Sequence, residues 1–239
     1  MARSVMRVLV TRPLEDAKGT AERLLKLGHT PIVSPLLEIR FRDGAPLSLA
    51  GVQAVIATSA NGVRALIRRT GRRDLPVFAV GAQTAAAARE AGFRDVKNSD
   101  GDSAALADAI PAWAKPDGGI LFHAAGNETA GKLFERLRAH GFQMRRDVLY
   151  DVLPAESLSR GAVEAMGAGR LDAVLLYSPR SAENFSRCVR AAGLTEMCRN
   201  LMAVCISEAA ANKCSDLPLR EIRVGDRPSE DAMFEALRR

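Results

Sequence analysis

A repeat offset of about 112 residues limits how this chain can fold more than any other feature. An apolar run, a helical pattern, a glycine and a second short run occur in that order near the start, and again from Ile120. Leu9 and Leu121 are 112 positions apart, and Gly28 and Gly141 are 113 apart, so the two copies stay nearly in register. Copies of this size predict two related domains, whereas solenoid repeats span only about 20–50 residues.

The composition indicates a chain with a buried core and a solvated surface, because 47% of its residues are hydrophobic and 26% are charged. No apolar run approaches the roughly 20 residues of a membrane span. The first residues lead straight into a strand-like run without the apolar segment of a signal peptide. We therefore expect a cytoplasmic protein that does not bind membranes.

The charge and the cysteines restrict the partners. A formal charge of +6 favours an anionic partner, but the arginines are scattered and there are only two tyrosines and one tryptophan for base stacking. A polyanionic small molecule explains the charge equally well, and we expect no nucleic acid. The four cysteines form no CxxC pair, and Cys205 lies in the apolar segment MAVCI, so we expect buried thiols and no metal site.

Short apolar runs alternate with helical patterns in both copies, which is typical of parallel sheets covered by helices. Strands are predicted at Val5–Val10, Pro31–Ser34, Val52–Thr58, Val77–Gly81, Asp95–Asn98, Ile120–His123, Arg146–Tyr150, Ala173–Tyr177, Met202–Ile206 and Arg220–Val224. Helices are predicted at Ala17–Leu27, Asn61–Arg69, Thr84–Ala91, Ser103–Trp113, Ala130–His140, Ser181–Ala192, Glu208–Cys214 and Glu230–Leu237.

Sheets of this kind bind ligands beyond the carboxyl ends of their strands. The predicted ends carry hydroxyls, small residues and helix N-terminal amides, which bind carboxylates or phosphates. The candidate binding residues are Arg12, Thr58, Ser59, Asn61, Gly81, Thr84, His123, Ser178 and Ser207. Each hydroxyl can also be a helix cap, Arg12 can be a surface cation, and His123 is more readily a polar lining residue than an acid or base.

Tyr150 is a further candidate, because it ends a predicted strand and precedes what reads as an exposed connector. A phenol beside a ligand site can donate a proton to a departing oxygen. The alternative is an aromatic residue that packs at an interface. The sequence contains no GxGxxG, GxxxxGK[ST], GxSxG or HExxH motif that would suggest other chemistry.

Five short motifs together resemble those of the uroporphyrinogen-III synthase family. They are VLVTRP at 8–13, TSANGV at 58–63, VGAQTA at 80–85, VLYDV around Tyr150 and YSPRSA at 177–182. The resemblance runs from about Met6 to the C-terminus. One departure is Ala210, where the family often has a threonine.

The resemblance implies a lyase without a cofactor. Its substrate would be hydroxymethylbilane, a linear tetrapyrrole polycarboxylate, which loses its terminal hydroxyl as water and closes into uroporphyrinogen III with the last pyrrole inverted. The reaction would pass through an azafulvene cation and a spirocyclic pyrrolenine. By match to the family motifs, Tyr150 would donate to the departing hydroxyl, and Thr84 and Ser178 would bind substrate. We expect a monomer, and a transient contact with the preceding enzyme of the pathway is compatible with this interpretation.

The resemblance also implies a different division of the chain. The repeat by itself predicts a boundary near Lys115. The family implies α/β architecture with two doubly wound parallel-sheet (flavodoxin-like) domains joined by a two-stranded β linker. The domains would be 1–37 with 152–239, and 49–148, and the linker would be 38–42 with 149–153.

Two alternatives remain open at this point. A non-catalytic two-domain sensor for an anionic small molecule would bind its ligand tightly and leave it unchanged. A nucleic-acid-binding protein would lose affinity steeply as salt increases.

Overall fold

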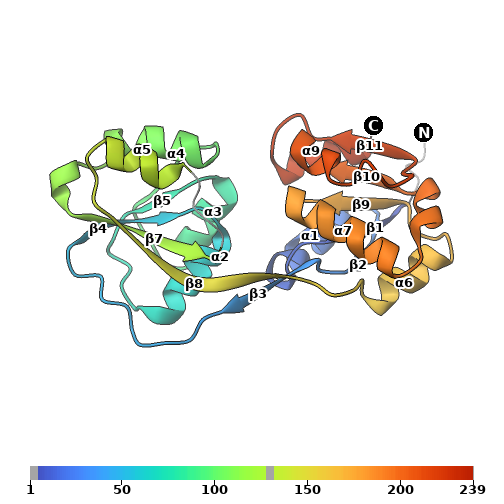
Figure 1. The fold of residues 1–239 in the computed structure, drawn as a ribbon, viewed down its shortest axis with the longest axis horizontal. Coiled ribbons are helices and arrows are strands. Elements are labelled where there is room, and N and C mark those ends of the chain that lie inside the picture. The colour runs from blue at the N-terminus through green and yellow to red at the C-terminus, as the bar shows by residue number, and fades with distance from the viewer. Residues whose placement is uncertain (1–4, 128–131, 239) are drawn as a thin grey trace. The chain divides into compact units, whose positions relative to one another are not determined.

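The computed structural model describes residues 5–127 and 132–238, and the chain folds as a mixed α/β protein (Figure 1). It divides into two compact units. Unit 1 comprises Met1–Glu38 and Leu153–Arg239, and unit 2 comprises Ile39–Val152. In Figure 1 the first, darkest blue segment and the orange-to-red segment form unit 1, and the chain from the blue strand β3 through cyan and green to the yellow strand β8 forms unit 2.

Unit 1 contains a five-stranded sheet in the order β11-β10-β9-β1-β2, with every neighbouring pair parallel. Its strands are β1 (Arg7–Val10), β2 (Thr30–Val33), β9 (Ala173–Leu176), β10 (Met202–Cys205) and β11 (Glu221–Val224). One face packs against α1 (Leu14–Lys26) and α9 (Glu230–Arg238). The other packs against α6 (Arg160–Gly167), α7 (Pro179–Ala191) and α8 (Glu208–Asn212), and a 3-10 helix covers Thr195–Asn200.

Unit 2 is built on a six-stranded sheet in the order β3-β8-β7-β4-β5-β6. Its strands are β3 (Leu37–Phe41), β4 (Val52–Ala57), β5 (Val77–Ala79), β6 (Val96–Asn98), β7 (Ile120–Gly126) and β8 (Met144–Pro154). One face packs against α2 (Ala60–Arg69) and α3 (Ala82–Glu90), and the other against α4 (Ser103–Ala109) and α5 (Leu133–Ala139). Short 3-10 helices cover Ile110–Ala112 and Pro116–Gly118.

Strand side chains alternate between the two faces, as a pleated strand requires. In β4, Val55 and Ala57 join the core cluster with α2 and α3, whereas Ala54 and Ile56 join the cluster with α4 and α5. The near-continuous apolar sequences of the strands therefore reflect burial on both faces, and the predicted α/β class with parallel sheets is confirmed.

The repeat and the units divide the chain differently. In the repeat, β1 and β2 correspond to β7 and β8, and β9, β10 and β11 correspond to β4, β5 and β6. With this correspondence the five matched strands of each sheet have the same order, 2-1-3-4-5, which is that of flavodoxin-like sheets, and β3 is an additional edge strand in unit 2. Each sheet combines the first two strands of one copy with the last three of the other. A boundary near Lys115 is therefore wrong, because β7 pairs with β4 from before that residue.

Each predicted strand and helix overlaps an observed one, with two differences in the helices. The predicted helix Ser103–Trp113 leaves α geometry after Ala109, because Pro111 has no amide hydrogen for the helical ladder. Helix α6 was not predicted, since Gly161 and Gly167 weaken its helical pattern. The first residues of the predicted helix Ala130–His140 lie outside the described residues.

No helix within residues 5–127 and 132–238 has the length and apolar character needed to cross a bilayer. In the same ranges, no three His, Cys, Asp or Glu side chains gather in a way that could hold a metal ion. The four cysteines are buried free thiols in one core cluster of unit 1, as predicted for Cys205.

Candidate active site

Tyr150 lies in strand β8 as predicted, but the strand continues past it to Pro154, where the sequence suggested an exposed connector. The exposed fraction of Tyr150 is 6%, and it pairs with Gly126 at the end of β7. The register shifts here, because Ala125 pairs with Val148 and Gly126 with Tyr150, which leaves Leu149 as an extra residue. Leu149 and Tyr150 consequently pack into the same core cluster, unlike consecutive residues of a regular strand. Bulges of this kind re-aim side chains and are frequent next to active sites.

Two contacts fix the phenol of Tyr150. Its hydroxyl oxygen lies 2.7 Å from Oγ of Ser59, and either group can donate the hydrogen bond. Its ring lies against Gly126, where an added Cβ would be 2.8 Å from both Cε2 and Cζ of the ring. Burial raises the pKa of Tyr150 above its ordinary value of 10, although the bond to Ser59 and the charge of Arg146 act in the opposite direction. The phenol therefore keeps its proton at neutral pH.

Ser59 also begins helix α2. Its backbone is extended, and its Oγ accepts a hydrogen bond from the amide of Gly62 at 3.1 Å. A Cβ on Gly62 would lie 2.5 Å from the carbonyl oxygen of Ala124, so only glycine lets α2 start this close to β7. Ser59 is thus both a helix cap and the partner of Tyr150. Asn61, in the first turn, accepts a hydrogen bond from Arg64 at 2.8 Å.

Thr58 and His123 form a second pair, in which Oγ1 of Thr58 lies 3.1 Å from Nε2 of His123. His123 does not end its strand as predicted, because β7 continues through small residues to Gly126. Its exposed fraction is 2%, and its ring packs on Phe134 with 5.8 Å between centroids. Burial, with a smaller effect of the Arg146 charge, lowers the pKa of His123 to about 4. The imidazole is therefore neutral at physiological pH.

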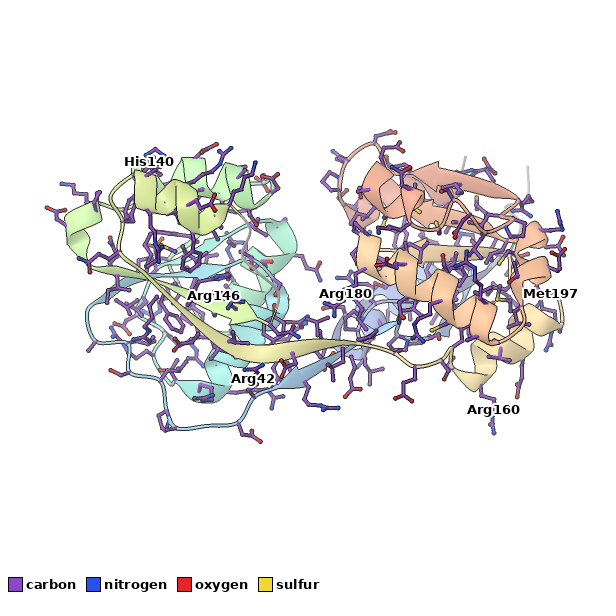
Figure 2. All side chains as sticks on the ribbon, in the orientation of Figure 1. Arg42, His140, Arg146, Arg160, Arg180 and Met197 are labelled. Atoms are coloured by element: carbon purple, nitrogen blue, oxygen red, sulfur yellow. The ribbon has the colours of Figure 1, made fainter. Side chains whose placement is uncertain are left out.

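Arg146, which Figure 2 shows on β8 of unit 2, holds the end of β7. Its Nη2 donates to the carbonyl oxygen of Gly126 at 2.6 Å. The amide of Asn127 donates to the carbonyl oxygen of Tyr150 at 3.0 Å, and its side chain accepts from the amide of Val152. These contacts fix the backbone on both sides of Tyr150.

Gly81 and Thr84 lie at the start of α3. Gly81 is the N-cap, and within the part of the chain that the structure describes no side chain caps this helix through its N-cap position. Thr84 is buried, with 5% of its surface exposed. Between the residues that the structure describes, no hydrogen bond links either of them to Tyr150, Ser59 or Thr58.

In unit 1, Arg12 is held by two carboxylates. Its guanidinium lies 3.2 Å from Glu230 and 3.5 Å from Asp16, and its Cζ is 4.6 Å from the ring centroid of Tyr177. The Tyr177 hydroxyl also donates to Glu230, at 2.8 Å, and Thr20 donates to the same carboxylate oxygen. Arg12 is therefore part of a network centred on Glu230.

The two candidate serines of unit 1 cap helices. Ser178 accepts from the amide of Ser181, whose hydroxyl accepts in return from the amide of Ser178, which forms a capping box before α7. Ser207 accepts from the amide of Ala210 at the start of α8. Helix capping, the alternative that the sequence left open, accounts for the bonds that both hydroxyls make.

The family model described as uroporphyrinogen-III synthase HemD matches residues 18–235. The chain belongs to the uroporphyrinogen-III synthase family. It is accordingly an enzyme, a lyase that cyclises hydroxymethylbilane. The family membership favours this activity over that of a non-catalytic sensor.

Two solved structures of uroporphyrinogen-III synthases share the fold. The enzyme from Helicobacter pylori is 16% identical, with a TM-score of 0.63 and coverage of 97% of each chain. A mutant of the enzyme from Thermus thermophilus is 18% identical, with a TM-score of 0.54 and coverage of 98% of this chain and 97% of the other. At these identities the likeness concerns the fold alone. No curated protein matches this member of the family significantly.

Sequence reasoning missed several residues of this synthase that position the candidates. The sequence gives only a weak indication that Gly126 belongs to the site, namely that a glycine follows a buried strand. It gives no indication for Glu230, because the partners of Glu230, which are Arg12, Thr20 and Tyr177, are far from it in the sequence. Chemically, the set in unit 2 offers one buried proton donor, Tyr150, and a helix start that presents polar groups to an anion.

Proposed function

We propose that Tyr150 donates a hydrogen bond, and then its proton, to the hydroxyl that leaves hydroxymethylbilane. The observation that carries this proposal is a buried, protonated phenol held at 2.7 Å from Ser59 Oγ. The C–O bond breaks with both electrons on oxygen, the hydroxyl leaves as water, and an azafulvene cation remains. The Ser59 hydroxyl can donate to the phenolate oxygen while it carries negative charge. The proton lost when the closed ring regains aromaticity restores the phenol.

A raised pKa makes the phenol a weak acid, which is compatible with this reaction. An electron-rich pyrrole expels a neighbouring hydroxyl readily, so donation to the departing oxygen assists the step without being indispensable. The larger task is to hold the flexible cation so that the productive carbon attacks it through the spirocyclic pyrrolenine. That is a problem of proximity and orientation more than of acid strength.

We also propose that helix starts bind the carboxylates of the substrate. In unit 2 the first amides of α3 after Gly81 have no side-chain cap, and a carboxylate would complete them. The amide of Asn61, in the first turn of α2, would add a donor, and the hydroxyl of Thr58, which contacts His123 at the end of β4, would add another. In unit 1 we assign the same role to Arg12, Ser178 and Ser207. Each of these residues would bind the substrate while it keeps its present partner in the protein.

For the chain as a whole we propose two domains, with 49–148 inserted between 1–37 and 152–239. The segments 38–42 and 149–153, which lie in or beside β3 and β8, would form the linker. The adjacency of β3 and β8 in one sheet supports this assignment. We propose that the enzyme acts as a monomer in the cytoplasm, and sedimentation at assay concentration tests the oligomeric state.

The deciding experiment generates hydroxymethylbilane in the presence of the protein, oxidises the products and separates the isomers. The proposal predicts the type III isomer, with its inverted ring. Type I alone, which unassisted closure gives, would overturn the proposed activity. A heat-unfolded sample of the same protein controls for unassisted closure.

A further inference from the structure

The end of β4 is held from both faces of its sheet. Thr58 and Ser59 are consecutive, and at a strand end consecutive side chains point to opposite faces. Ser59 meets Tyr150, which belongs to the core cluster on the side of α2 and α3. Thr58 meets His123, whose ring contacts Phe134 of α5 on the other side.

Burial argues against direct contact between His123 and the substrate. Only 2% of its surface is exposed, and its ring lies on the sheet face opposite to that of Tyr150. It is neutral at physiological pH, so it supplies no positive charge for a carboxylate. Any effect of His123 on the reaction must therefore pass through a neighbour, and Thr58 is the polar neighbour that it reaches.

The sequence repeat provides an internal comparison. The residue matched to His123 in the first copy is Thr11, which is also fully buried and whose hydroxyl donates to the carbonyl oxygen of Leu175 at 2.6 Å. That threonine satisfies its hydrogen bond within the sheet. His123 bonds Thr58 through Nε2, but in residues 5–127 and 132–238 its Nδ1 is buried without a hydrogen-bond partner, which costs stability. The threonine of the first copy thus bonds a carbonyl of its own sheet, whereas the longer imidazole reaches the hydroxyl of Thr58 at the strand end.

We propose that His123 is a positioning residue for Tyr150, acting through Thr58 and Ser59. Its bond to Thr58 fixes the turn from β4 into α2, and this turn sets where Oγ of Ser59 meets the phenol hydroxyl. Ser59 follows Thr58 directly in the chain, so a backbone rotation at Thr58 moves the Ser59 side chain. The catalytic part of this inference rests on the proposed role of Tyr150 as proton donor.

Two substitutions separate positioning from folding. His123→Thr reproduces the residue of the first copy, which fits a buried strand but cannot reach Thr58. His123→Gln retains a terminal amide that can contact Thr58. We expect His123→Thr to lower kcat about fivefold to tenfold with KM changed less than twofold, and His123→Gln to recover most of the loss. Equal losses in both variants would overturn the inference.

A spectroscopic measurement tests the coupling without relying on catalysis. The chain has two tyrosines, Tyr150 in unit 2 and Tyr177 in unit 1, so labelling tyrosine at Cζ with carbon-13 gives two signals, assigned with Tyr150→Phe. We expect His123→Thr to shift the Tyr150 signal, His123→Gln to restore it, and neither to move the Tyr177 signal. An unmoved Tyr150 signal in His123→Thr overturns the inference, whatever the rate. A shifted signal with an unchanged kcat supports the positioning and overturns the proposed role of Tyr150 instead.

Discussion

The ring of Tyr150 lies against Gly126, its partner across strands β7 and β8. A methyl group on Gly126 would stand 2.8 Å from two ring carbons and 3.1 Å from the phenol oxygen. The position of the Tyr150 ring therefore depends on the absence of a side chain at Gly126 of the neighbouring strand. The bond between Tyr150 and Ser59 is the contact that a displaced ring would lose first.

We predict that Gly126→Ala displaces this ring. Misplacing a reacting group by about 1 Å costs up to roughly 100-fold in rate, and forcing a methyl group into a packed site costs about 1–3 kcal/mol. We expect kcat to fall by at least about tenfold and unit 2 to be destabilised within that range. Trp113, the only tryptophan, lies in unit 2, so its fluorescence during urea unfolding reports that unit.

Gly71→Ala is the matched control, because a Cβ there meets no atom within 4 Å and the backbone is not in the left-handed region. We expect its stability to stay within about 0.5 kcal/mol of wild type and its kcat to be unchanged. Wild-type activity in Gly126→Ala would show that the phenol does not need its present position.

The hydroxyl of Tyr150 can be removed without disturbing its ring. We predict that Tyr150→Phe lowers kcat about 10-fold to 100-fold without abolishing turnover, since general acid assistance contributes about that much or more. The control is Tyr177→Phe, which loses a hydrogen bond to Glu230 but keeps the ring beneath Arg12. Its kcat should stay within about threefold of wild type. A wild-type rate in Tyr150→Phe would show that Tyr150 serves only in packing.

The burial of Tyr150 could not be predicted from the sequence, although the strand around it could. After Tyr150, Asp151 and Pro154 suggest a connector. In the structure β8 continues because Arg42 binds the Asp151 carboxylate through Nε at 2.9 Å and Nη2 at 2.6 Å. The bulge at Leu149 depends on the partner strand β7, which lies more than twenty residues earlier. The local hydrophobic pattern predicts helices and strands, but the contact of Arg42 with Asp151 and the pairing of β7 with β8 depend on the tertiary structure.

The division into units shows the same limit. Both copies of the repeat carry their strands in the same order along the chain, so the sheet order is the same whether strands pair within a copy or across copies. The hydrophobic patterns of β1 and β9 do not show whether these strands pair within one copy of the repeat or across the two copies. Hydrophobic periodicity predicts the strands and helices, whereas the division of the chain depends on which strands pair, and that pairing is tertiary.

Acid pH tests the environment of His123. Its folded pKa, about 4, lies below the ordinary value of 6.5, so the unfolded chain binds a proton more readily than the folded one. The stability from neutral His123 is fully present above about pH 6.5 and is lost as pH falls towards 4. We predict that lowering pH from 7 to 4.5 costs wild type about 2–3 kcal/mol more than His123→Thr, measured by Trp113 fluorescence in urea. Equal pH dependence in the two proteins would contradict the depressed pKa and the burial that causes it.

Glu230 joins helix α9 to α1 and to the end of β9. One of its carboxylate oxygens accepts from Thr20 at 2.5 Å, from Tyr177 at 2.8 Å and from Arg12 at 3.2 Å, and the other accepts from Arg23. The glutamate side chain is only 16% exposed, so these contacts are partly shielded from solvent. Burial raises the pKa of Tyr177, and the charge of Glu230 adds to this effect, whereas the charge of Arg12 opposes it.

We predict that Glu230→Gln destabilises unit 1 by about 2 kcal/mol, because hydrogen bonds to charged groups contribute about 1.5–3 kcal/mol and the variant keeps the shape but not the charge. Far-UV circular dichroism in urea measures this loss. Glu164→Gln is the control, because its pair with Arg160 is exposed, with side-chain fractions of 64% and 93%, and Figure 2 shows Arg160 at the surface. It should cost less than about 0.5 kcal/mol. Equal losses in the two variants would mean that the Glu230 network is no stronger than a surface ion pair.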